Sequence, residues 1–75
     1  MSKKYKMTEV KKQHGSATLY QIEALKDFGN VKKGDKGGFI EKEDNLSQDG
    51  NAWVYGNAWV SGDAWVSGDA WVEEL

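Results

Sequence analysis

The chain has 75 residues, no cysteine, no proline and a net charge of −2 at neutral pH. This length predicts one small domain over residues 1–75, and the lack of cysteine excludes a disulfide framework. Because the chain has a single histidine, His14, we do not expect a structural zinc site. Because it has no run of about 18–20 apolar residues, we do not expect a membrane-spanning helix. We therefore expect a cytoplasmic protein with no metal and no cofactor. Self-association is then the remaining means of stabilising so small a domain.

The charge is divided unevenly along the chain. Residues 1–42 contain all ten lysines and five acidic residues, for a net charge of +5, whereas residues 43–75 contain seven acidic residues and no basic one. Ordinary solubility explains such a pattern. Head-to-tail attraction between copies, or docking on a basic partner, is the more specific alternative.

The N-terminal part, residues 4–31, predicts a β-hairpin. The turn residues 14–16 are followed by residues 17–25, whose side chains alternate between a face that contains Ile22 and an opposite face. A helix over residues 19–28 is the alternative, because apolar side chains also recur there every three residues. The strand is favoured, since no clear N-cap with a capping glutamate precedes this segment.

Glycine interrupts the middle of the chain. Gly29, Gly34 and the pair Gly37-Gly38 predict positions that need a positive φ or a close approach of two backbones.

A six-residue repeat fills the C-terminal half. The unit Gly-(Asn/Asp)-Ala-Trp-Val occurs four times, and Phe39-Ile40 and Asn45-Leu46 extend the spacing upstream to six units. Side chains alternate along a strand, so the alanine and valine of each unit share one face and the tryptophan takes the other. Either face could be the interior. A parallel coil and an antiparallel meander with two-residue Gly-Asn or Gly-Asp turns both accommodate the pattern.

The motif Val-x-Gly-(Asn/Asp)-Ala-x, repeated from Val54 onward, resembles the hexapeptide repeat of left-handed parallel β-helices over residues 38–73. In that family three hexapeptides form one triangular coil, and an aliphatic and a small residue of each unit point inward. The resemblance implies an all-β fold in which the hairpin caps a two-coil left-handed parallel β-helix. The core positions that it implies are Ile40, Leu46, Ala52, Val54, Ala58, Val60, Ala64, Val66, Ala70 and Val72.

Two such coils would stack equivalent units on one another. The vertical pairs expected from this stacking are Ile40–Val60, Leu46–Val66, Val54–Val72, Phe39–Trp59, Trp53–Trp71 and Asn45–Trp65. The aromatic side chains would then point outward, where members of the family usually carry polar residues. Four exposed indoles favour burial against another molecule, unless the hairpin covers some of them. The interface residues predicted for self-association or partner binding are Phe39, Trp53, Trp59, Trp65 and Trp71.

The composition also bears on the class of function. There is no arginine, and the tryptophans lie in the acidic half, so direct nucleic-acid binding is not expected. The family's catalytic group is often a histidine near the coils, whereas His14 is expected in a turn far from the repeats. We therefore predict a non-enzymatic binding protein with no catalytic residue. A carbohydrate-binding repeat protein and a miniature hexapeptide-repeat transferase remain the alternatives.

A second resemblance concerns the region upstream of the repeats. Residues 22–29 and 33–41 resemble the head of small phage and prophage proteins that carry such repeats. This implies an accessory protein acting in the cytoplasm of a bacterial host. By analogy, its partner would be a basic nucleic-acid-handling host protein, for instance a defence complex such as CRISPR, which it would inhibit.

Overall fold

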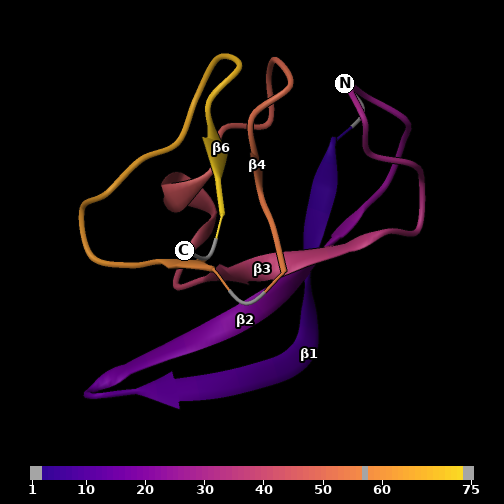
Figure 1. Ribbon diagram of the computed structural model, residues 1–75. Helices are drawn as coiled ribbons and strands as arrows, with labels where there is room; N and C mark the ends of the chain where they lie inside the picture. The colour runs from indigo at the N-terminus through magenta and orange to yellow at the C-terminus, as the bar shows by residue number, and fades with distance from the viewer. Residues whose placement is uncertain (1–2, 57, 74–75) are drawn as a thin grey trace.

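The computed structural model describes residues 3–56 and 58–73 and is all-β (Figure 1). The 3-10 turn η1 (Glu43–Asn45) is the one helical element among these residues. None of them forms a helix with the length and apolar character that a bilayer crossing requires. The strands are β1 (Tyr5–His14), β2 (Ala17–Ala24), β3 (Lys36–Ile40), β4 (Trp53–Val54), β5 (Trp59–Val60) and β6 (Trp71–Val72).

The predicted hairpin is confirmed. Strands β1 and β2 pair antiparallel from Tyr5 opposite Ala24 to His14 opposite Ala17. The strand prediction over residues 17–25 is therefore right and the helix alternative is wrong. Ile22, on the face identified from the alternation, is fully buried.

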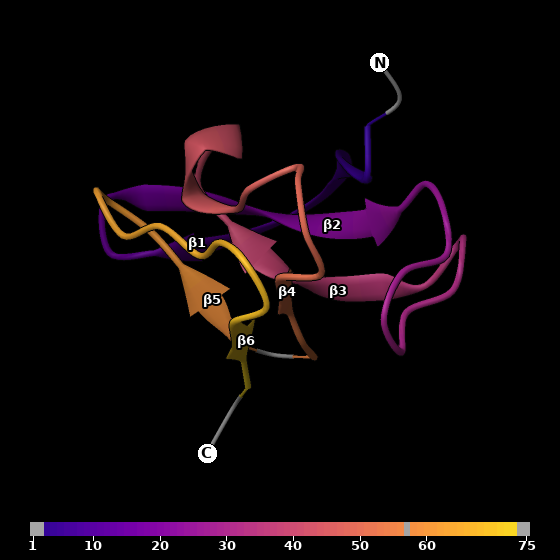
Figure 2. The same cartoon turned by 90° about the horizontal axis from the view of Figure 1, so that it is seen from above.

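Strand β3 joins the hairpin to the repeats. It pairs antiparallel with β2 on one side and parallel with β5 on the other, which gives the sheet order β1-β2-β3-β5 (Figure 2). The glycines make this junction possible. Gly29 and Gly34 have φ values of 51° and 93°, and a Cβ on Gly37 or Gly38 would collide with the backbone carbonyl of Val54 or Ala58. Both predicted uses of glycine are thus present.

The repeats pair in parallel, so the antiparallel meander is wrong. Strand β3 pairs with β5, β4 lies beside β6 (Figure 1), and a bridge joins Leu46 to Val66. The aligned residues observed in these pairings are Phe39–Trp59, Ile40–Val60, Leu46–Val66, Trp53–Trp71 and Val54–Val72. They are five of the six vertical pairs expected from stacking two rounds of repeats; the sixth, Asn45–Trp65, is not among these pairings. We refer to residues 39–54 as the first winding and to residues 59–72 as the second.

The alanine and valine face of the repeats lies inside, but its burial ends with the second winding. Seven of the ten expected core residues are buried, namely Ile40, Leu46, Ala52, Val54, Ala58, Val60 and Val66. Ala64 and Ala70 are exposed and Val72 is only half-buried, which corrects the expectation for these three. Among the described residues no further winding stacks on the second one, so its far side is uncovered.

The N-terminus is tied to the first winding by buried polar contacts. The Lys4 ammonium donates a hydrogen bond to the Ala52 carbonyl at 2.7 Å and lies 5.0 Å from the centroid of the Phe28 ring. The side-chain oxygen of Gln48 accepts from the backbone N–H of Lys4 at 2.8 Å, and the Tyr5 hydroxyl donates to the Leu46 carbonyl. Burial raises the pKa of that hydroxyl, and the carboxylates of Glu43 and Asp44 add to the effect.

Lys4 should make stability depend on pH. Burial lowers the pKa of its ammonium from 10.5 to about 8, against the opposing field of Asp49. Between these pH values the unfolded chain keeps the Lys4 proton and the folded chain has released it, so stability rises with pH. Relative to Lys4→Met, we expect the free energy of unfolding of the wild type to increase by on the order of 2 kcal/mol from pH 7 to pH 10. Urea denaturation of both proteins at the two pH values measures this, and a constant difference would contradict it.

Candidate interaction surface

The four equivalent tryptophans differ in their exposure to solvent. Trp53, in the first winding, is 1% exposed, whereas Trp59, Trp65 and Trp71, in the second winding, are 43%, 67% and 51% exposed. All four occupy the same place in the repeat, so the difference comes from what covers each one.

The prediction that Trp53 belongs to an open interface is wrong. Its indole is packed edge-on against Phe28, with ring centroids 5.2 Å apart, and against Tyr5 at 6.3 Å. The N-terminal segment and the loop before β3 therefore cover this side of the first winding. Phe39, the fifth predicted interface residue, is also buried, and the Lys12 ammonium lies 5.5 Å from the centroid of its ring.

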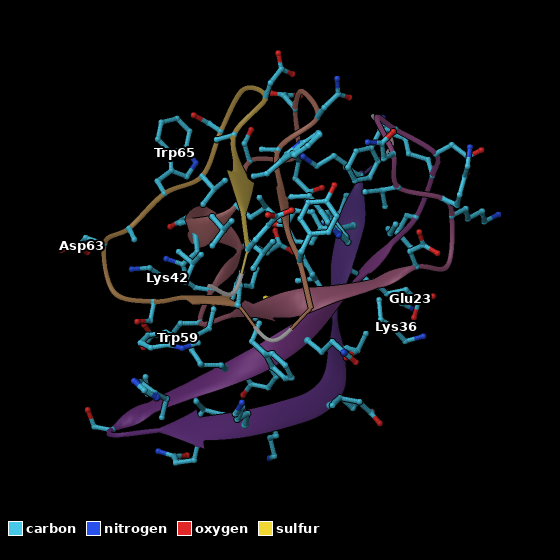
Figure 3. The ribbon with its side chains drawn as sticks, viewed as in Figure 1. Glu23, Lys36, Lys42, Trp59, Asp63 and Trp65 are labelled. Atoms are coloured by element: carbon cyan, nitrogen blue, oxygen red, sulfur yellow. The ribbon has the colours of Figure 1, made fainter. Side chains whose placement is uncertain are left out.

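Trp59 is partly covered by the tip of the hairpin. The His14 ring lies 3.8 Å from the Trp59 ring, centroid to centroid, at an interplanar angle of 44°. Figure 3 shows Trp59 on the side of the second winding that faces the hairpin, while Trp65 lies away from it. The expectation that His14 is far from the repeats is thus wrong. A ten-residue strand that starts beside the first winding is long enough to bring its far end back to β5.

Trp65 borders a surface depression of about 440 Å³. The other lining residues are Glu43, Asp44, Leu46, Ser47 and Gln48. Its apolar floor is Leu46, which is buried, and its acidic side comes from the short turn η1. We call this feature the Trp65 depression.

Trp71 is contacted by an aromatic neighbour. The Tyr55 ring is edge-on to it at a centroid distance of 5.9 Å. Burial, and to a smaller extent the Glu73 carboxylate, raises the pKa of the Tyr55 hydroxyl. The hydroxyl therefore remains protonated at neutral pH.

Asn45 holds the two windings together at the corner next to Trp65. Its side-chain oxygen accepts hydrogen bonds from the backbone N–H groups of Glu41 and Lys42 at 3.1 and 2.9 Å. Its side-chain nitrogen donates to the carbonyls of Gly62 and Ala64 at 3.1 and 2.8 Å. The residue is completely buried. Sequence reasoning placed Asn45 above Trp65 but missed this role, for which the signal was a polar residue in an otherwise aromatic position.

Charged side chains add weaker links between the windings. The Glu41 carboxylate accepts from the Gly62 N–H at 2.7 Å, and Lys42 lies 3.9 Å from Asp63 (Figure 3). On the opposite side of the view, Lys36 pairs with Glu23 at 3.2 Å.

Within residues 3–56 and 58–73, no three His, Asp or Glu side chains gather in a way that would hold a metal ion.

The comparisons with known proteins give one partial likeness. No family model matches the chain. Over 37 residues it is 49% identical to a protein of Escherichia coli strain K12 named "uncharacterized acetyltransferase YdcK". The matched segment covers 49% of this chain and 11% of that protein, so the chain spans only a small part of its length.

Proposed function

We propose that the chain is a non-enzymatic binding module that associates with itself and with a protein partner through the tryptophans of its second winding. We further propose that its repeats form a short left-handed parallel β-helix capped by the hairpin. Parallel pairing of Ile40 with Val60, Leu46 with Val66 and Val54 with Val72 supports two stacked coils. The partial identity to a protein named as an acetyltransferase is compatible with a hexapeptide-repeat origin.

The observation that carries the proposal is the exposure of Trp59, Trp65 and Trp71. Tryptophan is the residue most enriched at binding hot spots, and three exposed indoles within residues 59–72 are costly to leave in water. The uncovered far side of the second winding, with exposed Ala64 and Ala70, adds further apolar surface.

The charge distribution indicates how copies would meet. The exposed edge strand β1 carries Lys6, Lys11 and Lys12, whereas the second winding carries Asp63 and Asp69. Two identical edges repel one another, since lysines face lysines or acids face acids. A head-to-tail contact between the basic edge of one copy and the acidic end of another is attractive and is expected to weaken with salt.

Sedimentation velocity of the wild type and of a Trp59→Lys/Trp71→Lys variant tests self-association. We expect concentration-dependent association of the wild type and a folded monomer for the variant, with circular dichroism as the check on folding. Trp53 is kept in both proteins because its burial makes it part of the core. A wild type that sediments as a monomer at all concentrations would overturn self-association.

The partner that we propose is a basic nucleic-acid-handling protein of a bacterial host, with inhibition of a defence complex such as CRISPR as the wider role. Purified complexes of this class can be incubated with the wild type and with the same double variant. Loss of target cleavage with the wild type alone would support the role. Unchanged cleavage with both proteins would contradict it for that complex.

A transferase is the second candidate, because the partial relative is named as an acetyltransferase. His14 beside Trp59 is the one imidazole that the repeats bring near their surface. Acetyl-coenzyme A turnover by the wild type that is lost in His14→Ala would favour this reading over the binding module. Binding to a glycan array would instead favour the carbohydrate alternative.

A further inference from the structure

We propose that the Trp65 depression is a binding site for an arginine side chain of a protein partner, which stacks on the indole while its guanidinium reaches the carboxylates of Glu43 and Asp44. This inference deepens the proposed function and rests on it. It assigns to one of the three exposed tryptophans a ligand of defined chemistry.

The site is built from parts that the fold holds in place. The backbone on either side of Trp65 is held against the first winding by the Leu46–Val66 bridge and by the Asn45 hydrogen bond to the Ala64 carbonyl. The lining also includes Gln48, whose side-chain oxygen already accepts from the N–H groups of Lys4 and Tyr5. A ligand therefore meets a preformed site, which lowers the entropic cost of binding.

The chemistry of the lining residues selects a planar cation. An exposed indole attracts a cation over its face, and the attraction is strongest for tryptophan. A guanidinium stacks flat on the ring and directs its N–H groups toward a carboxylate at the same time, which an ammonium does less well. Glu43 and Asp44 line the same depression and supply the negative charge.

The chain already places one of its own cations at the edge of this site. The Lys3 ammonium lies 3.0 Å from the Glu43 carboxylate, and both side chains are substantially exposed. An exposed pair of this kind is weak and can be displaced. Lys3 should therefore compete with an incoming arginine for Glu43, and its removal should strengthen arginine binding. A purely structural role for Lys3 would not predict this increase.

The test is a titration followed by the four indole N–H signals in ¹H–¹⁵N spectra, assigned with single Trp→Phe variants. The probe is acetyl-Gly-Gly-Arg-Gly-Gly-amide, and the matched peptides carry lysine or citrulline in place of arginine. Citrulline keeps the planar shape without the charge. We expect saturable movement of the Trp65 signal with the arginine peptide, at least about threefold weaker binding of the lysine peptide, and none of the citrulline peptide.

Substitutions in the protein test the assignment of the arginine site further. Glu43→Gln/Asp44→Asn should weaken arginine binding about five- to tenfold, Lys3→Ala should strengthen it about two- to threefold, and Glu73→Gln, outside the depression, should leave it unchanged. Equal binding of the citrulline or lysine peptide, equal movement of the Trp59 and Trp71 signals, or no movement of Trp65 would overturn the assignment. The proposed function would then still be judged separately by the sedimentation of Trp59→Lys/Trp71→Lys.

Discussion

Replacing Trp53 with alanine should lower the free energy of unfolding by about 3–5 kcal/mol, which is typical of removing a fully buried tryptophan. The indole fills the space between the first winding and the N-terminal segment, where it packs on Tyr5 and Phe28. A domain of this size has little stability to spare, so we expect the variant to be largely unfolded at 25 °C. Urea denaturation followed by circular dichroism measures the change.

The repeat supplies its own control for this prediction. Trp65→Ala removes the same side chain from the same position of a later repeat unit, in the second winding, where the indole is 67% exposed. We expect a change within about 0.5 kcal/mol in the monomer, because little buried contact is lost. Similar destabilisation by the two substitutions would show that position in the repeat, and not coverage by the N-terminal segment, decides the role of tryptophan.

Replacing Asn45 with alanine should cost about 2–4 kcal/mol, because four backbone groups lose a partner at once. The N–H groups of Glu41 and Lys42 and the carbonyls of Gly62 and Ala64 all bond to this one side chain. The Glu41 N–H also donates to the Val60 carbonyl at 3.1 Å. Since these groups belong to both windings, we expect hydrogen exchange to increase at the corner of the second winding as well as at the substituted site. Proton exchange measured by NMR, together with urea denaturation, checks both effects.

Two further substitutions define the contribution of the amide. Asn45→Asp keeps an oxygen that faces Glu41 and Lys42 but replaces the donor to Gly62 and Ala64 with a second oxygen, so we expect it to be no better tolerated than alanine. Asn30→Ala, in an exposed turn, should change stability by less than about 0.5 kcal/mol. A mild effect of Asn45→Ala would mean that water replaces these hydrogen bonds.

Most of the strand pairing could be predicted from the sequence because it follows from local rules. The six-residue period marks the equivalent positions of the units, and the alternation of side chains puts valine and alanine on one face and tryptophan on the other. The pairs Ile40–Val60 and Val54–Val72 follow from this period once the resemblance to β-helices with three hexapeptides per coil is added. The hairpin follows in the same way from a turn signal and a period-two face.

The candidate site was less accessible to such reasoning. The acidic residues of the Trp65 depression come from η1, which lies between the first two units of the repeat, and its lining includes Gln48, which is held by the N-terminal segment. Neither feature has a periodic signal. The contact between His14 and Trp59 likewise depends on the path of the whole hairpin and not on any local pattern.

The sequence by itself determined that this protein is all-β and that the alanine and valine of each repeat unit share one face while the tryptophan takes the other. Only the tertiary structure decided which indoles meet water. The direction of a side chain is set within each strand and therefore recurs in every repeat unit. Its burial depends on which segment, distant in the sequence, packs against that strand. Tyr5 and Phe28 cover Trp53, and no described residues cover Trp65 to the same extent.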